Sequence, residues 1–473
     1  EPRTERLEIP VPRSCQRRRP APKVAPPSPP MPRPTPSSRR TFLKTAGAAA
    51  LAAPFFARNL HAAAPSKVLR HASFGASGMA WSDIQAIMGN PFVKLVAVAD
   101  VDLNKVANVK AAYPDIRIYQ DWRQLLDKEA KNIDSVNVSV PDHMHAPIGY
   151  SAMQLGKHVY GQKPLAHNIY ETRMLTTIAR EKSLVTQMGI QIHATENYRR
   201  VVELIQGGAI GPVTVAHVWV SRAWGLQSKQ EAEKANDRVF VTSRPAEMPV
   251  PEGLHWDLWI GGAPFRPYNE VYFPGPKWYR WWDFGNGTMS DLGSHWNDLP
   301  FWALQLKAPL AIEAFGPPAH PEIAPATMRA VYEFGARGDL PPVRVTWHQG
   351  DERPEIWKQG GIPQWRDGAL FIGKKGMLLS DYGKHVLLPE KDFAGFTRPP
   401  QKFPKAASHH QEWIDACKGK GRPLADFEYS GWLTESNHLG NVAYRVGQPL
   451  EWDAENLRAR NCPAAEEFVQ HHY

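Results

Sequence analysis

The chain has 473 residues, 42% of them hydrophobic and 22% charged, which accommodates two or three domains with a large core. Its net charge is +9, but residues 1–64 hold the whole excess, and the remainder carries equal numbers of basic and acidic residues. The composition therefore gives no case for nucleic-acid binding.

Residues 1–64 have the features of a leader. Residues 1–36 contain 12 prolines and no periodic apolar pattern, which predicts disorder. The segment Ser38–Lys44 (SRRTFLK) precedes a short apolar run and an Ala62–Ala64 cleavage pattern, an arrangement typical of a twin-arginine export signal. An uncleaved anchor or a chance basic segment is the alternative, although the apolar run is too short to cross a bilayer. We expect a periplasmic or otherwise exported protein, free of the membrane after cleavage; Met31 leaves open whether residues 1–30 are translated.

From residue 65 the chain alternates short apolar runs with amphipathic segments. Strands are expected at Val68–Phe74, Lys94–Asp100, Ile116–Tyr119, Ile133–Val140, His158–Gly161 and Leu184–Gly189. Helices are expected at Trp81–Met88, Leu103–Ala112, Trp122–Ala130, Ala146–Leu155 and Tyr170–Glu181. This alternation predicts an α/β fold whose first domain, residues 65–190, is a Rossmann-type, doubly wound parallel sheet with helices on both faces.

The turn between the first strand and the first helix is a candidate dinucleotide site. Small residues there let the backbone approach a pyrophosphate, and the helix N-terminus supplies N–H groups. The candidate cofactor contacts are Gly75, Ser77, Gly78 and Met79. Ser77 and Ala80 replace glycines of the G-x-G-x-x-G pattern, and a turn without a ligand is the alternative. Asp100 ends the second strand, where a carboxylate holds ribose hydroxyls and repels a 2′-phosphate, so we expect NAD, with NADP possible.

Two loops follow strands at the same edge of this sheet. After strand 133–140 come Pro141, His143 and His145, which are candidate cofactor contacts. The H-x-H spacing suits a metal, but no third ligand lies nearby in the sequence, so we expect no metal site. After strand 158–161 comes Lys163, which is a candidate to contact the cofactor and to polarise a substrate hydroxyl; a surface lysine is the alternative. Outside the leader, at most one disulfide is possible, between Cys417 and Cys462.

Beyond residue 190 strand-like runs dominate. A strand-into-helix segment, 187–211, precedes runs at Val213–Ser221, Leu310–Phe315, Arg329–Phe334, Val343–His348, Leu370–Ile372, Gly376–Ser380 and His385–Leu388. Helices return at His409–Cys417 and Tyr429–Tyr444. The pattern predicts a second α/β domain, residues 191–460, with a large open, mostly antiparallel sheet for substrate binding and oligomerisation, and a C-terminal tail, 461–473.

Six of the 17 tryptophans fall between Trp224 and Trp282, in a stretch rich in proline and glycine. We expect an ordered loop over the cleft. The rings of Trp281 and Trp282 are candidates to stack on a sugar, and packing inside the loop is the alternative.

A carboxylate and an imidazole, Asp291 and His295, stand four residues apart after a glycine-rich loop. If a helix begins near Ser290, the two share one face, and Asp291 can orient His295 as a general base. A capped surface helix with an incidental histidine is the alternative.

Together these motifs resemble the Gfo/Idh/MocA family of oxidoreductases, over about residues 67 to 453. The resemblance rests on Gly75–Ala80, Ala99–Asp102, Pro141–Ala146, Lys163-Pro164, Gly285–Asp298 and the helix Tyr198–Gly211. The family's Glu-Lys-Pro motif appears as Gln162-Lys163-Pro164, and its Asp-x-x-x-His pair matches Asp291 and His295. The resemblance implies a bound nicotinamide, a sugar-like substrate and a homodimer or homotetramer packed through the open sheet. Tyr198 and His193 are further candidate substrate contacts.

The expected reaction is oxidation of a secondary alcohol of a sugar, polyol or glycoside. His295 is the base, Asp291 its partner, and Lys163 the donor that polarises the hydroxyl. Because free NAD is not plentiful outside the cytoplasm, an exported enzyme would carry a tightly bound cofactor and recycle it. Paired sugar oxidation and reduction satisfies this requirement, and so does NAD-dependent glycoside cleavage through a transient keto sugar; a non-catalytic sugar sensor is a third reading.

Overall fold

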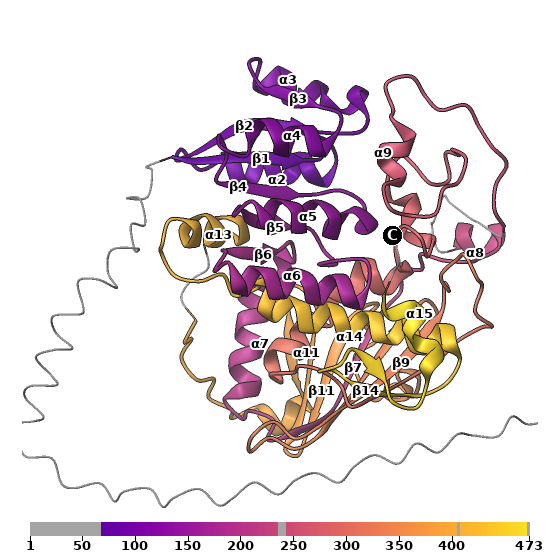
Figure 1. Ribbon diagram of the computed structural model, residues 1–473. Helices are drawn as coiled ribbons and strands as arrows, with labels where there is room; N and C mark the ends of the chain where they lie inside the picture. Colours follow the sequence, from indigo (N-terminus) through magenta and orange to yellow (C-terminus); the bar gives the residue numbers. More distant parts are fainter. Residues whose placement is uncertain (1–67, 235–242, 404–406, 471–473) are drawn as a thin grey trace, which may run out of the picture. The chain divides into compact units, whose positions relative to one another are not determined.

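The computed structural model describes residues 68–234, 243–403 and 407–470. The leader, with its twin-arginine motif and cleavage pattern, lies outside these residues, and the export signal stays a prediction. The described residues belong to one compact unit, which begins at Pro65 and contains two sheets (Figure 1).

The first sheet is parallel, in the order β3-β2-β1-β4-β5-β6. Its strands are β1 (Leu69–Phe74), β2 (Val93–Ala99), β3 (Arg117–Tyr119), β4 (Ser135–Val138), β5 (His158–Gly161) and β6 (Thr186–Met188). The helices are α2 (Met79–Met88), α3 (Ala107–Ala112), α4 (Trp122–Glu129), α5 (His145–Gln154) and α6 (Ile169–Glu181). Every residue of β4 is buried, as expected for a strand covered on both faces. The predicted doubly wound sheet is confirmed.

The second sheet has nine strands in the order β13-β12-β11-β7-β10-β9-β8-β14-β15. The strands are β7 (Val213–Val220), β8 (Ala311–Phe315), β9 (Met328–Phe334), β10 (Val343–Gln349), β11 (Gly368–Gly373), β12 (Gly376–Ser380), β13 (His385–Leu388), β14 (Leu450–Asp453) and β15 (Arg458–Ala459). Among its pairings for which a register is described, only β7–β10 is parallel, which confirms a mostly antiparallel sheet. The sequence pattern missed β14 and β15 because they are too short to show alternation.

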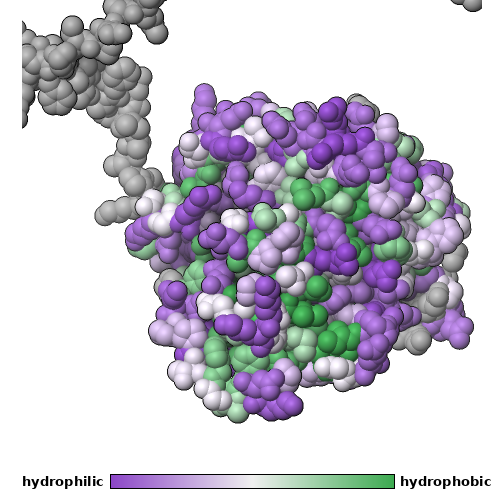
Figure 2. Space-filling view, turned by 90° about the horizontal axis from the view of Figure 1, so that it is seen from below, coloured by the Kyte–Doolittle hydropathy of each residue, from purple (hydrophilic) through white to green (hydrophobic). Residues whose placement is uncertain are grey.

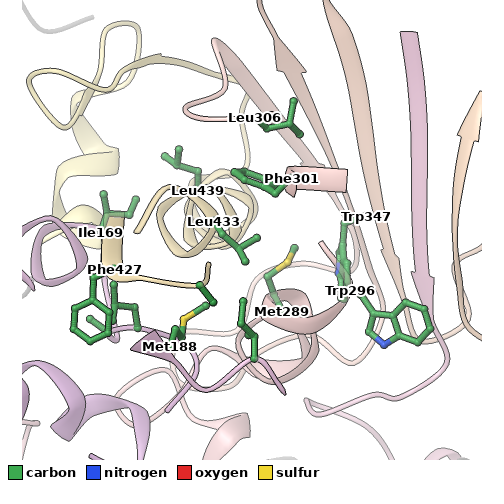
Figure 3. Close-up of a cluster of buried hydrophobic side chains, with 14 of the residues drawn as sticks. Ile169, Met188, Met289, Trp296, Phe301, Leu306, Trp347, Phe427, Leu433 and Leu439 are labelled. Atoms are coloured by element: carbon green, nitrogen blue, oxygen red, sulfur yellow. The ribbon is translucent and has the colours of Figure 1, made fainter. Parts of the chain in front are cut away.

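A long helix, α14 (Phe427–Val446), joins the two halves. It contacts α6 and β8, and Asp426 caps its N-terminus by accepting a hydrogen bond from the Tyr429 N–H. Figure 3 shows Leu433 and Leu439 of α14 among apolar side chains from both parts of the chain, including Met188, Met289 and Phe301. The core is therefore continuous from the first sheet to the second.

Further helices complete the described fold: α7 (Glu196–Gln206), α8 (Lys229–Lys234), α9 (Trp256–Ile260), α10 (Ser294–Trp296), α11 (Asp298–Ala303), α12 (Glu355–Lys358), α13 (His409–Cys417) and α15 (Glu466–Val469). The helix α13 returns to pack against α2 of the first domain. In the expected C-terminal tail, α15 is folded against α14, with Arg445 over the Phe468 ring at 3.9 Å. Cys417 and Cys462 are free thiols, so the possible disulfide does not form.

None of the described helices combines the length and apolar character that a membrane span requires. Seen from below, polar residues cover much of the surface, with apolar patches between them (Figure 2).

Candidate active site

A cavity of about 800 Å³ lies at the carboxyl edge of the first sheet. One end is lined by the turn after β1 and by Asp100, and the other by Lys163, Asp291 and His295. The volume is in the range of small-molecule sites. The cavity therefore brings most of the predicted nucleotide contacts and the predicted catalytic residues into one space.

The turn at Gly75–Met79 fits a dinucleotide. Gly75 has φ +99°, and a Cβ there would lie 2.4 Å from the Ser139 carbonyl oxygen, so only glycine fits. Gly78 has φ +57°, and a Cβ there would meet no atom within 4 Å, so its backbone faces open space. Ser77, Gly78 and Met79 line the cavity at the start of α2, where a helix leaves N–H groups without intrahelical partners.

Asp100 also lines the cavity, and it holds the turn in place. Its two carboxylate oxygens accept hydrogen bonds from the N–H groups of Ala76, at 2.9 Å, and Asp102, at 3.0 Å. Burial raises the pKa of Asp100 to about 6, against the effect of these hydrogen bonds. The carboxylate lies at the end of β2, as predicted, and its contact with a ribose stays a prediction.

The opposite wall of the cavity comes from residues 252–284, which we call the aromatic wall. Its own core includes Trp256, Trp259 and Trp281. It docks on the loop after β2: the Leu103 N–H donates to the Gly253 carbonyl at 3.0 Å, and the His255 N–H donates to the Val101 carbonyl at 2.9 Å. In Figure 1 this segment, with α9, stands alongside the first sheet. The expectation of an ordered loop over the cleft holds for its described residues.

Lys163 and Asp291 form the centre of the catalytic end. The Lys163 ammonium lies 2.5 Å from Asp291 Oδ1 and donates to the Tyr279 hydroxyl at 3.0 Å. The Trp224 indole donates to the other oxygen of Asp291 at 2.5 Å. Burial acts to lower the pKa of Lys163, but Asp291 and Tyr279 outweigh it and hold that pKa above its ordinary value. Lys163 is therefore an ammonium donor, not a base.

His295 lines the same cavity but is not paired with Asp291, contrary to the sequence prediction. The segment Met289–Gly293 is a π-helix, and α10 begins only at Ser294. Because a π-helix has more residues per turn than an α-helix, the expected i, i+4 pairing does not form. Burial and the charge of Lys163 lower the pKa of His295 to about 3, only partly opposed by Asp291. The imidazole is neutral at physiological pH, and its buried Nδ1 has no partner among the described residues.

His143 and His145 were expected to contact the cofactor, but they are buried away from the cavity lining. The two ring nitrogens of His145 lie 2.7 Å from the Pro164 carbonyl and 2.8 Å from the Val140 carbonyl. Burial lowers the pKa of His145 to about 4, so the neutral ring donates a hydrogen bond to one of them and lies between the two loops. His143 bonds to the Trp259 carbonyl at 2.8 Å and holds the aromatic wall. Pro141, between the strand and these histidines, does line the cavity. Among the described residues, no group of three or more His, Cys, Asp or Glu side chains is placed to hold a metal ion.

The four predicted substrate contacts are also buried outside the cavity lining. Trp281 is fully buried in the core of the aromatic wall, and the Trp282 indole donates to the His320 carbonyl. His193 pairs with Asp298 at 2.9 Å and stacks on Trp302. Tyr198 does not line the cavity, but its hydroxyl donates a hydrogen bond to the backbone carbonyl of His295 at 3.1 Å. Their apolar surfaces fill cores, which is the alternative that the sequence left open for the tryptophans.

Other residues line the cavity that the sequence analysis did not single out, among them Asp142, Arg222, Trp224, Tyr279 and Tyr382. Burial raises the pKa of Asp142 well above its ordinary value, and its Oδ1 has no partner among the described residues. Asp142 lies within the Pro141–Ala146 motif, in which only Pro141 and the two histidines were predicted to contact the cofactor. No local sequence pattern marks Arg222 or Tyr382, because they follow strands that are distant from each other in the sequence and meet only in the folded sheet.

Two family models cover more than half of the chain. The first, described as an oxidoreductase family with an NAD-binding Rossmann fold, matches residues 69–190, and the second, the C-terminal alpha/beta domain of the same family, matches residues 197–338. The chain belongs to the Gfo/Idh/MocA family of oxidoreductases. Its first domain is the family's NAD-binding domain.

Individual relatives of this Gfo/Idh/MocA protein match over shorter stretches. A levoglucosan dehydrogenase from Pseudarthrobacter phenanthrenivorans is 28% identical over 26% of this chain and 30% of its own length. A dTDP-3,4-didehydro-2,6-dideoxy-alpha-D-glucose 3-reductase from Streptomyces antibioticus is 29% identical over 36% of this chain and 50% of its own. The chain thus spans half or less of the length of these curated relatives.

Solved structures of the same fold cover most of the chain. The WlbA dehydrogenase from Bordetella pertussis, in complex with NADH and UDP-GlcNAcA, has a TM-score of 0.56 at 14% identity and covers 82% of this chain and 99% of its own. An aldose-aldose oxidoreductase from Caulobacter crescentus, complexed with glycerol, has a TM-score of 0.52 at 14% identity and covers 81% of this chain and 100% of its own. At this identity the likeness establishes the fold alone.

This Gfo/Idh/MocA protein has glutamine at position 162, where the family motif has glutamate. The Gln162 amide donates to Asp83 Oδ2 at 2.8 Å, and the same carboxylate binds the Ser139 hydroxyl at 2.7 Å and His410 at 2.9 Å. Asp83 is fully buried on α2. A glutamate at 162 would meet this carboxylate, so the glutamine is explained by the neighbouring Asp83.

Proposed function

We propose that this chain is a nicotinamide-dependent oxidoreductase that oxidises a secondary alcohol of a sugar, polyol or glycoside. The observation that carries the proposal is that the Lys163–Asp291 pair and His295 line the same cavity as the nucleotide turn. When bound, NAD accepts the hydride, and the protein has to position the carbinol and manage its proton. A sensor that only binds sugar would not need a buried ammonium beside a neutral imidazole.

The two side chains divide the work with the proton. Lys163 stays protonated because Asp291 lies 2.5 Å away, so it donates to the substrate oxygen and stabilises developing negative charge. His295 is neutral, so of these two side chains it is the one that can accept the proton that the hydroxyl loses, although its lowered pKa makes it a weak base. Asp291 positions Lys163 rather than His295.

The replacement of Lys163 tests the proposal. In Lys163→Ala, turnover should fall by about 10²-fold or more, while NAD remains bound, because the nucleotide turn is intact. Absorbance near 340 nm measures turnover with candidate sugars, and the nucleotide released on denaturation measures NAD content. Lys110→Ala, at an exposed position on α3, is the control. Turnover of Lys163→Ala within a few-fold of the native protein would remove Lys163 from the reaction.

The aromatic wall that faces the nucleotide turn across the cavity supports a second part of the proposal, that NAD is retained and recycled on the protein. A nucleotide lying between the turn after β1 and the aromatic wall would contact both surfaces, and its release would break both sets of contacts. Retention suits either a paired sugar oxidation and reduction or glycoside cleavage through a transient keto sugar. The two differ in outcome: cleavage frees an aglycone without any net change in cofactor redox state.

We also propose export by the twin-arginine route, on the strength of Arg39 and Arg40 and the residues that follow them. A reporter fused to residues 31–64 should be exported, and Arg39→Lys with Arg40→Lys should block that export. Assembly as a homodimer or homotetramer stays a prediction.

A further inference from the structure

Two arginines lie beside the catalytic end of the cavity. Arg222 follows β7 and Arg366 precedes β11, and these two strands are neighbours in the second sheet. Ser221 links the two strand ends: it accepts a hydrogen bond from Arg366 Nε at 2.7 Å, and its N–H donates to Asp367 at 2.6 Å. Both guanidinium groups are thus held at one end of the sheet, and both line the cavity.

The two arginines differ in how their charge is balanced. Arg366 is paired with Asp367 at 3.2 Å. Arg222 has Asp291 at 3.6 Å, but that carboxylate already binds Lys163 and Trp224, each at 2.5 Å. Two cations, Lys163 and Arg222, therefore share one carboxylate. This end of the cavity has a surplus of positive charge close to the reacting groups.

The donors of Arg222 are also available. Its guanidinium donates no hydrogen bond within the described part of the chain, and its side chain is 51% exposed. It lies over the Trp224 ring at 5.4 Å, a contact that orients the planar fork. A guanidinium presents five N–H donors, and a carboxylate, sulfate or phosphate group accepts from them in pairs.

Tyr382 adds a neutral donor to the same end. Its ring stacks on Trp296 at 4.1 Å, and its hydroxyl is buried without a partner among the described residues. Burial raises the pKa of Tyr382, and the charges of Asp291, Lys163, Asp367 and Arg222 all act on it. The phenol stays protonated and has a hydrogen bond to give to a ligand.

We infer that the substrate carries an anionic group, a carboxylate, sulfate or phosphate, which Arg222 binds with the help of Tyr382. The inference rests on the proposed function for the place of the reacting carbinol, between Lys163 and His295. The hydroxyl groups of a neutral sugar can accept hydrogen bonds from Arg222 and Tyr382, but only an anion also balances the second cation at this end of the cavity and accepts from the guanidinium in pairs.

Binding of matched sugars to the full chain, loaded with NAD, tests the inference. Calorimetry compares methyl glucoside with methyl glucuronide, and glucose with its 6-sulfate and 6-phosphate, with the galacto and manno series as further sets. At least one anionic sugar should bind tenfold or more tightly than its neutral parent, the size expected for a charge-assisted pair. The three kinds of anion separate a uronic acid from a sulfated or phosphorylated sugar.

Variants assign the preference to its residues. Arg222→Gln should abolish it, Arg222→Lys should keep part of it, and Tyr382→Phe should weaken it. Arg344→Gln, which removes an exposed arginine on β10 far along the sheet, should leave it unchanged. Equal binding of every anionic sugar and its neutral parent, or a preference that survives Arg222→Gln, overturns the inference.

The two proposals fail separately. Oxidation of neutral sugars without any preference for anions would leave the oxidoreductase and remove the anion site. Tight binding of an anionic sugar that depends on Arg222, without turnover of any sugar, would leave the anion site and remove the reaction.

Discussion

The Lys163 ammonium and the Asp291 carboxylate form an ion pair that is about nine-tenths buried, with Nζ 2.5 Å from Oδ1. The lysine comes from the loop after β5 and the aspartate from a π-helix 128 residues later. The pair therefore exists only when the two domains are docked, and it fixes the ionisation of both side chains.

Asp291→Asn should lower the pKa of Lys163 so that its titration affects the reaction. In the native protein the charge of Asp291 outweighs burial and keeps the pKa of Lys163 raised. Without that charge, burial dominates and lowers the pKa, so the ammonium is lost as the pH rises through the new value. The alkaline limb of kcat/KM should move to lower pH, and a pH profile measures it. An alkaline limb that stays in place would mean that Lys163 does not donate in the reaction.

Gly253→Ala should reduce the retention of NAD by the protein. Gly253 has φ +86°, and a Cβ there would lie 2.6 Å from Nδ2 of Asn104, whose amide binds the Glu252 carbonyl. The substitution pushes the aromatic wall off the loop after β2. The fraction of NAD retained after gel filtration should fall, with a faster release rate on dilution.

Gly208→Ala is the matched control for that change. Gly208 has φ +75°, so the backbone strain is similar, but a Cβ there meets nothing within 4 Å. Its NAD retention should equal that of the native protein. If both variants retain NAD equally, docking of the wall does not govern release.

Gln162→Glu should destabilise the fold in a pH-dependent way. The new carboxyl would be buried beside Asp83, so its pKa in the folded state would be raised above about 4.3. A raised carboxyl pKa costs nothing below the unfolded value, and the cost grows as the pH rises toward the folded value. At pH 7 we expect a loss of about 1–3 kcal/mol in the free energy of unfolding, measured with urea, and a smaller loss at pH 4.5.

A second substitution gives the control for this cost. Adding Asp83→Asn to Gln162→Glu restores one carboxylate and one amide in exchanged positions. The double variant should recover much of the lost stability, as coupled neighbours do. Simple addition of the two losses would mean that the residues do not interact.

Asp100→Asn should admit NADP. The carboxylate at the end of β2 repels a 2′-phosphate when ionised, and its pKa is raised to about 6 by burial. In the native protein the ratio of the NADP and NAD dissociation constants should fall as the pH drops from 7.5 to 5, because Asp100 takes up a proton. In the variant this ratio should be lower at pH 7.5 and should change less with pH. A native ratio as flat as that of the variant would contradict a role for Asp100.

Most of the fold could be predicted from the sequence because the spacing of apolar residues in each segment matches the side chains that the fold buries. The run KLVAVAD reads as a strand buried on both faces, and β2 covers Val93–Ala99. The six strands of the first sheet were found with errors of a few residues at their ends, whereas α11 and β14 were missed because they are too short to show a periodic pattern.

The site could be predicted only where a motif fixes the backbone. Gly75 and Lys163 stand at the ends of strands, and the topology of the sheet brings them to one edge. Asp291 and His295 were paired on the assumption of an α-helix, and the π-helix gives each of them other surroundings. The sequence could not show which aromatic residues line the cavity, because only tertiary packing buries Trp281 and places Trp224 at the cavity.

The docking of the aromatic wall also has a consequence for synthesis. The nucleotide turn is complete before residue 80, but the wall that faces it ends near residue 284, so the ribosome makes the two surfaces about 200 residues apart. A ligand that touches both surfaces binds the docked molecule more tightly than the first domain alone, and it adds binding free energy to the stability of the docked domains, up to about 2.7 kcal/mol at a concentration one hundred times Kd. Nucleotide that contacts both surfaces thereby favours the docked arrangement over a first domain that has folded alone.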